Sequence, residues 1–199
     1  MLFVDLPGCG KSEKVGKKAF SFESSAMEII KLIEQLSPKE KVILIAHSYG
    51  GLVVKEIIQK RSDLVEKIVV GSTNVKKSLL FWLYTRKIGC YILWEQNKER
   101  YRQDGTSWDC ICDMQKDAWS KFSLGSLETN RDIKCLFMVA EKDIKEIHES
   151  MKRWKKKFPN SEIYVVNNSG HNYFTELPEE VNPVVASFVN NKRICKNDL

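Results

Sequence analysis

Short apolar runs alternate with longer segments of helical periodicity along most of this chain. The apolar runs are typical of strands covered on both faces in a parallel sheet, and they occupy residues 42–45, 67–71, 133–140 and 162–166. Helical spacing of apolar residues is found at 25–36, from Leu52 onward, at about 144–158 and at 179–190. Strands that alternate with helices predict an α/β protein with a mostly parallel sheet and helices on both faces.

The first residues of the chain predict one more strand, followed by a glycine-rich loop. Residues 2–4 (Leu-Phe-Val) are apolar enough to be the end of a buried strand, and the sequence DLPGCGKS follows at 5–12. Its Gly10-Lys11-Ser12 ending invites a phosphate-binding P-loop interpretation. A P-loop needs glycine where this chain has Asp5, so a strand-to-helix loop is the better interpretation.

Residues 74–132 interrupt the alternation of strands and helices. The stretch is too long and too aromatic for a plain loop, so we predict a mostly helical insertion in a single domain that spans 1–199. It leaves the carboxyl end of the strand at 67–71, the edge where open α/β sheets bind ligands. Its aromatic side chains either line a substrate entrance or pack the insertion on the core. They are Trp82, Tyr84, Tyr91, Trp94, Tyr101, Trp108 and Trp119.

Composition and charge are those of an ordinary globular protein. Of the 199 residues, 43% are hydrophobic and 29% are charged, and the formal net charge is +6. The densest basic cluster, at 152–157, alternates with apolar residues at helical spacing, which favours the solvated face of an amphipathic helix over a nucleic-acid site. No apolar run reaches the length of a membrane span.

The cysteines give little sign of disulfides or metal. We expect a reducing, cytoplasmic location, because the six cysteines show no disulfide-like spacing and the chain starts without a signal sequence. Cys110 and Cys112 lack a second ligand pair nearby, so we expect no zinc site. The other cysteines are Cys9, Cys90, Cys135 and Cys195.

The stretch at 41–55, KVILIAHSYGGLVVK, predicts a strand, a tight turn and a helix. Ala46 and Gly50 flank Ser48 in the A-x-S-x-G pattern of a nucleophile elbow, with alanine in the first glycine position. Such a turn lifts the serine hydroxyl clear of the sheet and aims the backbone N–H of Tyr49 at the same point. Taken alone, the pattern fits an ordinary strand-to-helix loop equally well.

A base and an acid for Ser48 are found just past later strands. His171 lies in the loop after 162–166, and Asp143 follows 133–140, which gives the chain order serine, acid, histidine. The other two histidines are less suitable, because His47 should point away from the serine hydroxyl and His148 lies on the helix predicted at 144–158. A solvated loop acid and a solvated loop histidine remain the alternatives for each residue alone.

Four stretches together resemble the α/β-hydrolase superfamily, in particular its capped single-domain members. They are DLPGCGKS at 5–12, AHSYGG at 46–51, VAEKD at 139–143 and SGHNYFTELPEEV at 169–181. The resemblance implies Ser48 as nucleophile, His171 as general base and Asp143 as orienting acid, with 74–132 as the family's variable cap. A serine at the elbow argues against the family branches whose nucleophile is a carboxylate.

The expected function is therefore hydrolysis of an ester, thioester or related acyl bond through an acyl-enzyme. The backbone N–H of Tyr49 would bind the oxyanion, and the reaction needs no metal or organic cofactor. We expect a small, partly apolar acyl substrate and no nucleic-acid partner. The fold also carries other chemistries, so the resemblance alone does not fix the reaction.

The sequence departs from the family at the front. Ala46 and Cys9 are mild departures. The larger one is that the family has further strands before D-x-P-G. One of them lies in the sheet between the 1–5 and 41–46 strands, and the loop after it donates the second oxyanion N–H. We expect either an N-terminally truncated hydrolase or a reduced relative. The alternative function is a catalytically compromised binding module. Residues 1–5 would shift to pair with 41–46, or the open sheet edge would drive self-association.

Overall fold

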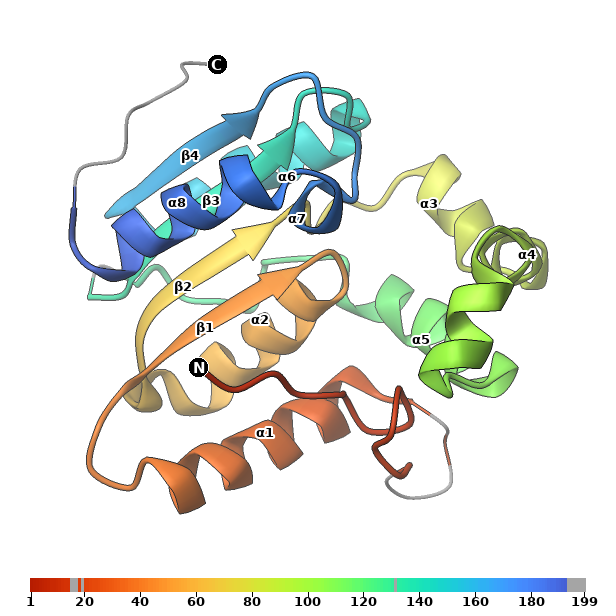
Figure 1. Ribbon diagram of the computed structural model, residues 1–199, viewed down its shortest axis with the longest axis horizontal. Helices are drawn as coiled ribbons and strands as arrows, with labels where there is room; N and C mark the ends of the chain where they lie inside the picture. Colours follow the sequence, from red (N-terminus) through yellow and green to blue (C-terminus); the bar gives the residue numbers. More distant parts are fainter. Residues whose placement is uncertain (15–17, 19, 131, 193–199) are drawn as a thin grey trace.

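The computed structural model describes residues 1–14, 18, 20–130 and 132–192. Four strands form one sheet, and the helices surround it, as predicted for an α/β protein (Figure 1). In chain order the elements are α1 (Phe22–Leu36), β1 (Val42–His47), α2 (Gly50–Arg61), the short 3-10 helix Ser62–Leu64, β2 (Val65–Gly71), α3 (Leu79–Tyr84), α4 (Lys87–Asp104), α5 (Trp108–Lys121), β3 (Lys134–Ala140), α6 (Lys145–Lys157), β4 (Ser161–Val166), α7 (Tyr173–Glu176) and α8 (Pro178–Val189).

The strands pair in parallel in the order β1-β2-β3-β4, which is also their order in the chain. His47 at the end of β1 pairs with Gly71 at the end of β2, and Ala140 at the end of β3 pairs with Val166 at the end of β4. All four carboxyl ends therefore lie along one edge. The loops that leave this edge carry Ser48, Asp143 and His171.

Alternate residues of the strands feed two separate apolar clusters. On one face, Ile68, Phe137 and Val165 pack with α1, α2 and α6. On the other face, residues such as Leu136 and Val166 pack with α7 and α8, and α8 lies across β3 and β4 in Figure 1. The alternation follows from the period of two along a strand, and it confirms helices on both faces of the sheet.

The strand predicted at residues 2–4 is wrong. Leu2, Phe3 and Val4 have no regular secondary structure, and Phe3 is 84% exposed. Apolar side chains favour a strand only where a neighbouring strand pairs with their backbone groups, and among the described residues β1 pairs with β2 alone. The predicted shift of residues 1–5 against β1 is therefore also absent from the described part of the chain, and that edge of β1 is open.

The prediction that 42–45 is covered on both faces is also wrong. Leu44 and Ala46 pack against the α1–α2 side. Ile45 points to the other side and is 44% exposed, because α8 reaches β3 and β4 but the second cluster includes no residue of β1 in the described ranges. β1 is thus an edge strand whose second face is only partly covered, with Ile45 exposed.

The segment at 74–132 is mostly helical, as predicted, and its helices α3–α5 lie beyond the carboxyl ends of the strands (Figure 1). The packing alternative finds an example in Trp119, which packs against the main core cluster, and a substrate entrance lined by aromatic side chains stays a prediction. Trp94 packs on Tyr101 and Trp108 within the insertion, and Phe122 at its end stacks on Tyr49 of the core. Trp82 and Tyr91 are exposed.

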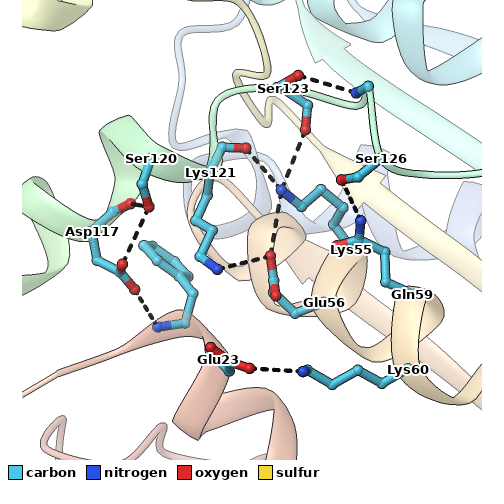
Figure 2. A network of polar contacts seen from close by, with 12 residues as sticks. Glu23, Lys55, Glu56, Gln59, Lys60, Asp117, Ser120, Lys121, Ser123 and Ser126 are labelled. Carbon is cyan, nitrogen blue, oxygen red and sulfur yellow. Dashed lines mark hydrogen bonds and ion pairs between the residues drawn. The ribbon is translucent and has the colours of Figure 1, made fainter.

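A buried ionic network joins α2 to the end of the insertion (Figure 2). The Lys55 ammonium donates to the carbonyl oxygens of Lys121 (2.9 Å) and Ser123 (3.3 Å) and lies 3.4 Å from the Glu56 carboxylate. Lys121 approaches the same carboxylate at 3.3 Å. Burial lowers the pKa of Lys55, which the nearby Glu56 carboxylate opposes. The network fixes where the insertion returns to the sheet.

The basic cluster on α6 has the amphipathic arrangement expected from its spacing. Met151 and Trp154 are buried, whereas Lys152, Arg153 and Lys155 are exposed. In the ranges that the structure describes, no helix is long and apolar enough to cross a membrane.

Candidate active site

The turn after β1 is a strained elbow with Ser48 at its apex. Ser48 has φ +52°, a left-handed conformation that is unfavourable for a residue with a side chain. Two contacts with the end of β2 hold it. The Ser48 N–H donates to the backbone oxygen of Gly71 (2.7 Å), and the Thr73 hydroxyl donates to the backbone oxygen of Ser48 (2.7 Å). α2 begins two residues later, so the serine lies between the strand end and a helix N-terminus.

The space around the elbow shows which glycine is required. A Cβ on Gly51 would lie 2.1 Å from the Thr73 hydroxyl oxygen, which no real Cβ tolerates. A Cβ on Gly50 would meet only the Ala46 Cβ, at an ordinary 3.4 Å. Alanine in the first glycine position is thus easily accommodated, and the close approach occurs at Gly51, which the A-x-S-x-G pattern does not include.

Ser48, His171 and Asp143 form one hydrogen-bonded chain. The His171 Nε2 lies 3.0 Å from the Ser48 hydroxyl oxygen, and its Nδ1 lies 2.9 Å from the Asp143 Oδ1. The Asp143 side chain is 2% exposed and the His171 side chain is 39% exposed. The Asp143 end of this hydrogen-bonded chain is therefore shielded from solvent, while the His171 imidazole is accessible to solvent and to a substrate.

Two groups besides His171 hold the Asp143 carboxylate. Its Oδ2 accepts hydrogen bonds from the Ala140 N–H (3.1 Å) and from the Ser72 hydroxyl. Burial raises the pKa of Asp143, but the hydrogen bonds with His171 and Ser72 outweigh it, and the net shift is downward. The carboxylate is thus kept ionised at neutral pH and is fixed in orientation from both sides.

Ser72 was not among the residues singled out from the sequence. It follows β2, is buried, and has φ +43°. Its hydroxyl also lies 3.4 Å from the Tyr173 hydroxyl, so it links the Asp143 carboxylate to α7. A serine after a strand is common, and only the structure shows that this one points at a buried acid.

The loops that carry Asp143 and His171 are bonded to each other. The Glu141 carboxylate accepts from the Asn168 N–H (2.6 Å), and the Lys142 N–H donates to the Ser169 oxygen (3.1 Å). These bonds place the acid loop alongside the histidine loop. Glu141, the other acid of the VAEKD stretch, is engaged in this contact.

His47 packs beside the imidazole of His171. Their ring centroids are 4.8 Å apart, and the His47 ring also contacts Tyr173 and Phe174. Burial, followed by the nearby His171, lowers the pKa of His47 to about 4, so it is neutral at pH 7. His148 lies on α6, as expected.

The Tyr49 side chain connects the elbow to the insertion. Its hydroxyl donates to the Gln115 side-chain oxygen on α5 (2.6 Å), and its ring lies between Phe22 and Phe122. Burial raises the pKa of the phenol, which therefore stays protonated. The backbone next to Ser48 is thus held by a contact that crosses from core to insertion.

The loop at 5–12 has the wrong chemistry for a phosphate. The Asp5 carboxylate accepts from the Lys11 N–H (3.0 Å), and the Ser12 hydroxyl donates to the Asp5 backbone oxygen (2.8 Å). An anionic side chain therefore takes the place that an anionic ligand would need. A cavity of about 350 Å³ lies between this loop and α1, and neither Ser48 nor His171 lines it.

Within the described ranges, no group of three or more histidine, cysteine or acidic side chains is placed to hold a metal ion. Five of the cysteines are free, and Cys195 lies outside the described residues.

A model of the alpha/beta hydrolase family matches residues 2–184. The chain belongs to this family. The hydrolase YugF of Bacillus subtilis (strain 168) is 25% identical over 218 residues, which cover 95% of this chain and 80% of YugF. This α/β-hydrolase also shares its fold with solved enzymes of the family.

Two of these structures are an esterase and a lipase. A thermophilic esterase from Thermogutta terrifontis superposes with a TM-score of 0.76 at 18% identity, over 94% of this chain and 78% of the esterase. A monoacylglycerol lipase from Paleococcus ferrophilus superposes with a TM-score of 0.67 at 20% identity, over 94% of this chain and 81% of the lipase. At these identities the likeness shows the fold.

Proposed function

We propose that this α/β-hydrolase cleaves an ester, thioester or related acyl bond with Ser48 as nucleophile, His171 as general base and Asp143 as orienting acid. The observation that carries the proposal is the continuous hydrogen-bonded chain from the Ser48 hydroxyl through both ring nitrogens of His171 to Asp143. The esterase and lipase among the structural neighbours agree with it.

The proton follows the two contacts of His171. As the Ser48 oxygen attacks the carbonyl carbon, its proton passes to Nε2 of His171, 3.0 Å away. The Asp143 carboxylate stabilises the imidazolium at Nδ1 and is itself held by Ser72 and Ala140. His171 then protonates the leaving group, and water hydrolyses the acyl-enzyme by the same route.

The oxyanion is the weak point of this site. The Tyr49 N–H at the start of α2 supplies one donor, by analogy with other nucleophile elbows. β1 pairs only with β2 among the described residues, so the strand expected to bring a second donor is not beside it. Loss of one donor costs about 100- to 1,000-fold in turnover. The open edge of β1 therefore favours a second candidate function, a binding module with little catalysis.

The substrate we propose is a small, partly apolar acyl compound. In the single domain of 1–199, the insertion at 74–132 would act as a cap beside the site, and it exposes apolar side chains such as Leu83 and Trp82. The proposed chemistry needs neither metal nor cofactor. We propose no nucleic-acid partner, because the basic residues of α6 form a solvated helix face.

Labelling with a fluorophosphonate probe distinguishes the two candidate functions. The probe reacts with an activated serine, so we expect a covalent adduct on Ser48 that is lost in Ser48→Ala and in His171→Ala. His148→Ala is the matched control and should label normally. Folded wild-type protein that gains no adduct would support the binding module, and an adduct on another serine would remove Ser48 from the mechanism.

A further inference from the structure

The structure brings together two cysteines that are 101 residues apart in the chain. The sulfur of Cys9, in the loop at 5–12, lies 3.1 Å from the sulfur of Cys110, near the start of α5. Cys9 is half-buried, and Cys110 is completely buried. A disulfide bond needs the sulfurs only about 1 Å closer than this.

The backbone around both thiols is held in place. The Cys9 N–H donates to the Leu6 oxygen (2.8 Å), and the Cys110 N–H donates to the Ser107 hydroxyl oxygen that caps α5 (3.1 Å). The loop also meets the segment just before α5, because the Gly10 N–H donates to the Thr106 hydroxyl oxygen (3.4 Å). One hydrogen bond therefore joins the two segments and a local one orders the backbone at each thiol, so little chain entropy remains to oppose bonding of the sulfurs.

We propose that Cys9 and Cys110 are a redox-active pair that closes to a disulfide and fastens the loop at 5–12 to the insertion helix α5. The oxidant we assign is a small-molecule disulfide such as oxidised glutathione. The inference is independent of the proposed catalytic function, because neither thiol belongs to the Ser48–His171–Asp143 chain.

The two thiols have different roles in the exchange. Cys9 is the accessible one, and the hydrogen bond from Cys110 lowers its pKa, which favours the thiolate. The Cys9 thiolate attacks one sulfur of the oxidant and expels the first glutathione thiolate. Cys110 then loses its proton and attacks the Cys9 sulfur of the mixed disulfide, which expels the second. Two electrons pass from the protein thiols to the oxidant, and the two released thiolates take up the two protons.

The disulfide has a mechanical consequence at the elbow. α5 also carries Gln115, whose side chain accepts the Tyr49 hydroxyl hydrogen bond. At the opposite end of α5, the backbone oxygen of Lys121 accepts a hydrogen bond from the Lys55 ammonium. A covalent bond at Cys110 would fix the remaining end of this helix, and it would close a loop of about 100 residues in the unfolded chain.

A second thiol contact makes the assignment testable. Cys112, two residues along α5, interacts with Cys90 of α4, and burial and this contact raise the pKa of Cys112 to about 11. Cys9 is accessible and its pKa is lowered, whereas the pKa of Cys112 is raised, so we expect the first attack on the oxidant at Cys9 and a slower reaction of Cys90–Cys112.

The experiment is equilibration of the whole protein with oxidised glutathione, followed by peptide mapping without reduction and by thermal melting. We expect a linked Cys9–Cys110 peptide and a melting temperature about 5 to 15 °C above that of the reduced protein, reversed by dithiothreitol. Cys9→Ser and Cys110→Ser should lose both, whereas the matched control Cys112→Ser should keep both.

Three results would overturn the proposal. One is folded, oxidised wild-type protein without the Cys9–Cys110 peptide. Another is a linked peptide that instead joins Cys90 to Cys112. The third is an oxidation-dependent rise in melting temperature that persists unchanged in Cys9→Ser.

Discussion

At the scale of single residues, the site depends on side chains that hold the reactive groups as much as on the reactive groups themselves. The Thr73 hydroxyl donates a hydrogen bond to the backbone oxygen of Ser48, and the Ser72 hydroxyl donates one to the Asp143 carboxylate. Both follow β2, so one short segment positions the serine and the acid. The strain of Ser48 at φ +52° persists because these neighbours over-determine it.

Gly51→Ala should disrupt the elbow, and Gly50→Ala should be tolerated. The added methyl at 51 would collide with the Thr73 side chain, which is fully buried and cannot move aside, whereas the methyl at 50 meets only ordinary contact with Ala46. We expect a loss of about 1 to 3 kcal/mol in the free energy of unfolding for the first variant and less than about 1 kcal/mol for the second. Urea denaturation measures both. Equal effects of the two changes would contradict this account of the turn.

The three residues of the proposed catalytic site could be singled out from the sequence because each stands in a local pattern. Ser48 follows an apolar run and precedes small residues, and Asp143 and His171 follow two later apolar runs. Parallel pairing brings all these strand ends to one edge, and the structure places the three side chains within hydrogen-bond distance. Ser72 could not be found this way, because an isolated serine carries no local signal of the acid it contacts.

At the scale of elements, α2 links the elbow at Ser48 to the insertion. Its first residues form the elbow, and its middle holds the buried Lys55–Glu56–Lys121 network. Helical periodicity predicted α2 but could not predict this network, because its partners are 66 and 68 residues from Lys55 in the chain. The strand at 2–4 failed for a related reason: strand formation depends on a neighbouring strand that local composition does not reveal.

Lys55→Met should destabilise the protein far more than Lys60→Met on the same helix. The first change removes the donor to the carbonyl oxygens of Lys121 and Ser123 and one of the two cations beside the buried Glu56 carboxylate, which should cost about 3 kcal/mol in the free energy of unfolding. The second removes a solvent-exposed ion pair with Glu23, worth less than about 1 kcal/mol (Figure 2). Guanidinium titrations compare them. A Lys55→Met variant as stable as Lys60→Met would show that the network contributes little.

At the scale of the whole molecule, the sheet is unevenly covered. α8 protects β3 and β4, while β1 carries the exposed Ile45 and a backbone edge that no other strand of the described ranges pairs with. Such an edge is a template for pairing with another strand. The sequence pattern predicted the fold class and the helices on both faces of the sheet. It did not predict the exposure of β1, because the same apolar run occurs in central strands and in edge strands.

We expect this edge to drive self-association of the chain. Size-exclusion chromatography at rising protein concentration should show dimers or larger species, and Ile45→Lys should shift them toward monomer, because a charge on an edge strand opposes strand pairing. Leu83→Lys is the matched control: it also replaces an exposed apolar residue, 50% exposed, but on α3. A wild-type protein that stays monomeric at all concentrations would remove the edge as an interface.

The measurement that tests the central claim most directly is hydrolysis of p-nitrophenyl acyl esters by the wild type and by variants of the Ser48–His171–Asp143 chain. We predict slow wild-type turnover that falls by about 1,000-fold or more in Ser48→Ala and in His171→Ala, while His148→Ala keeps the wild-type rate. Ester turnover that survives in folded Ser48→Ala, or that depends on His148 instead of His171, would contradict the account.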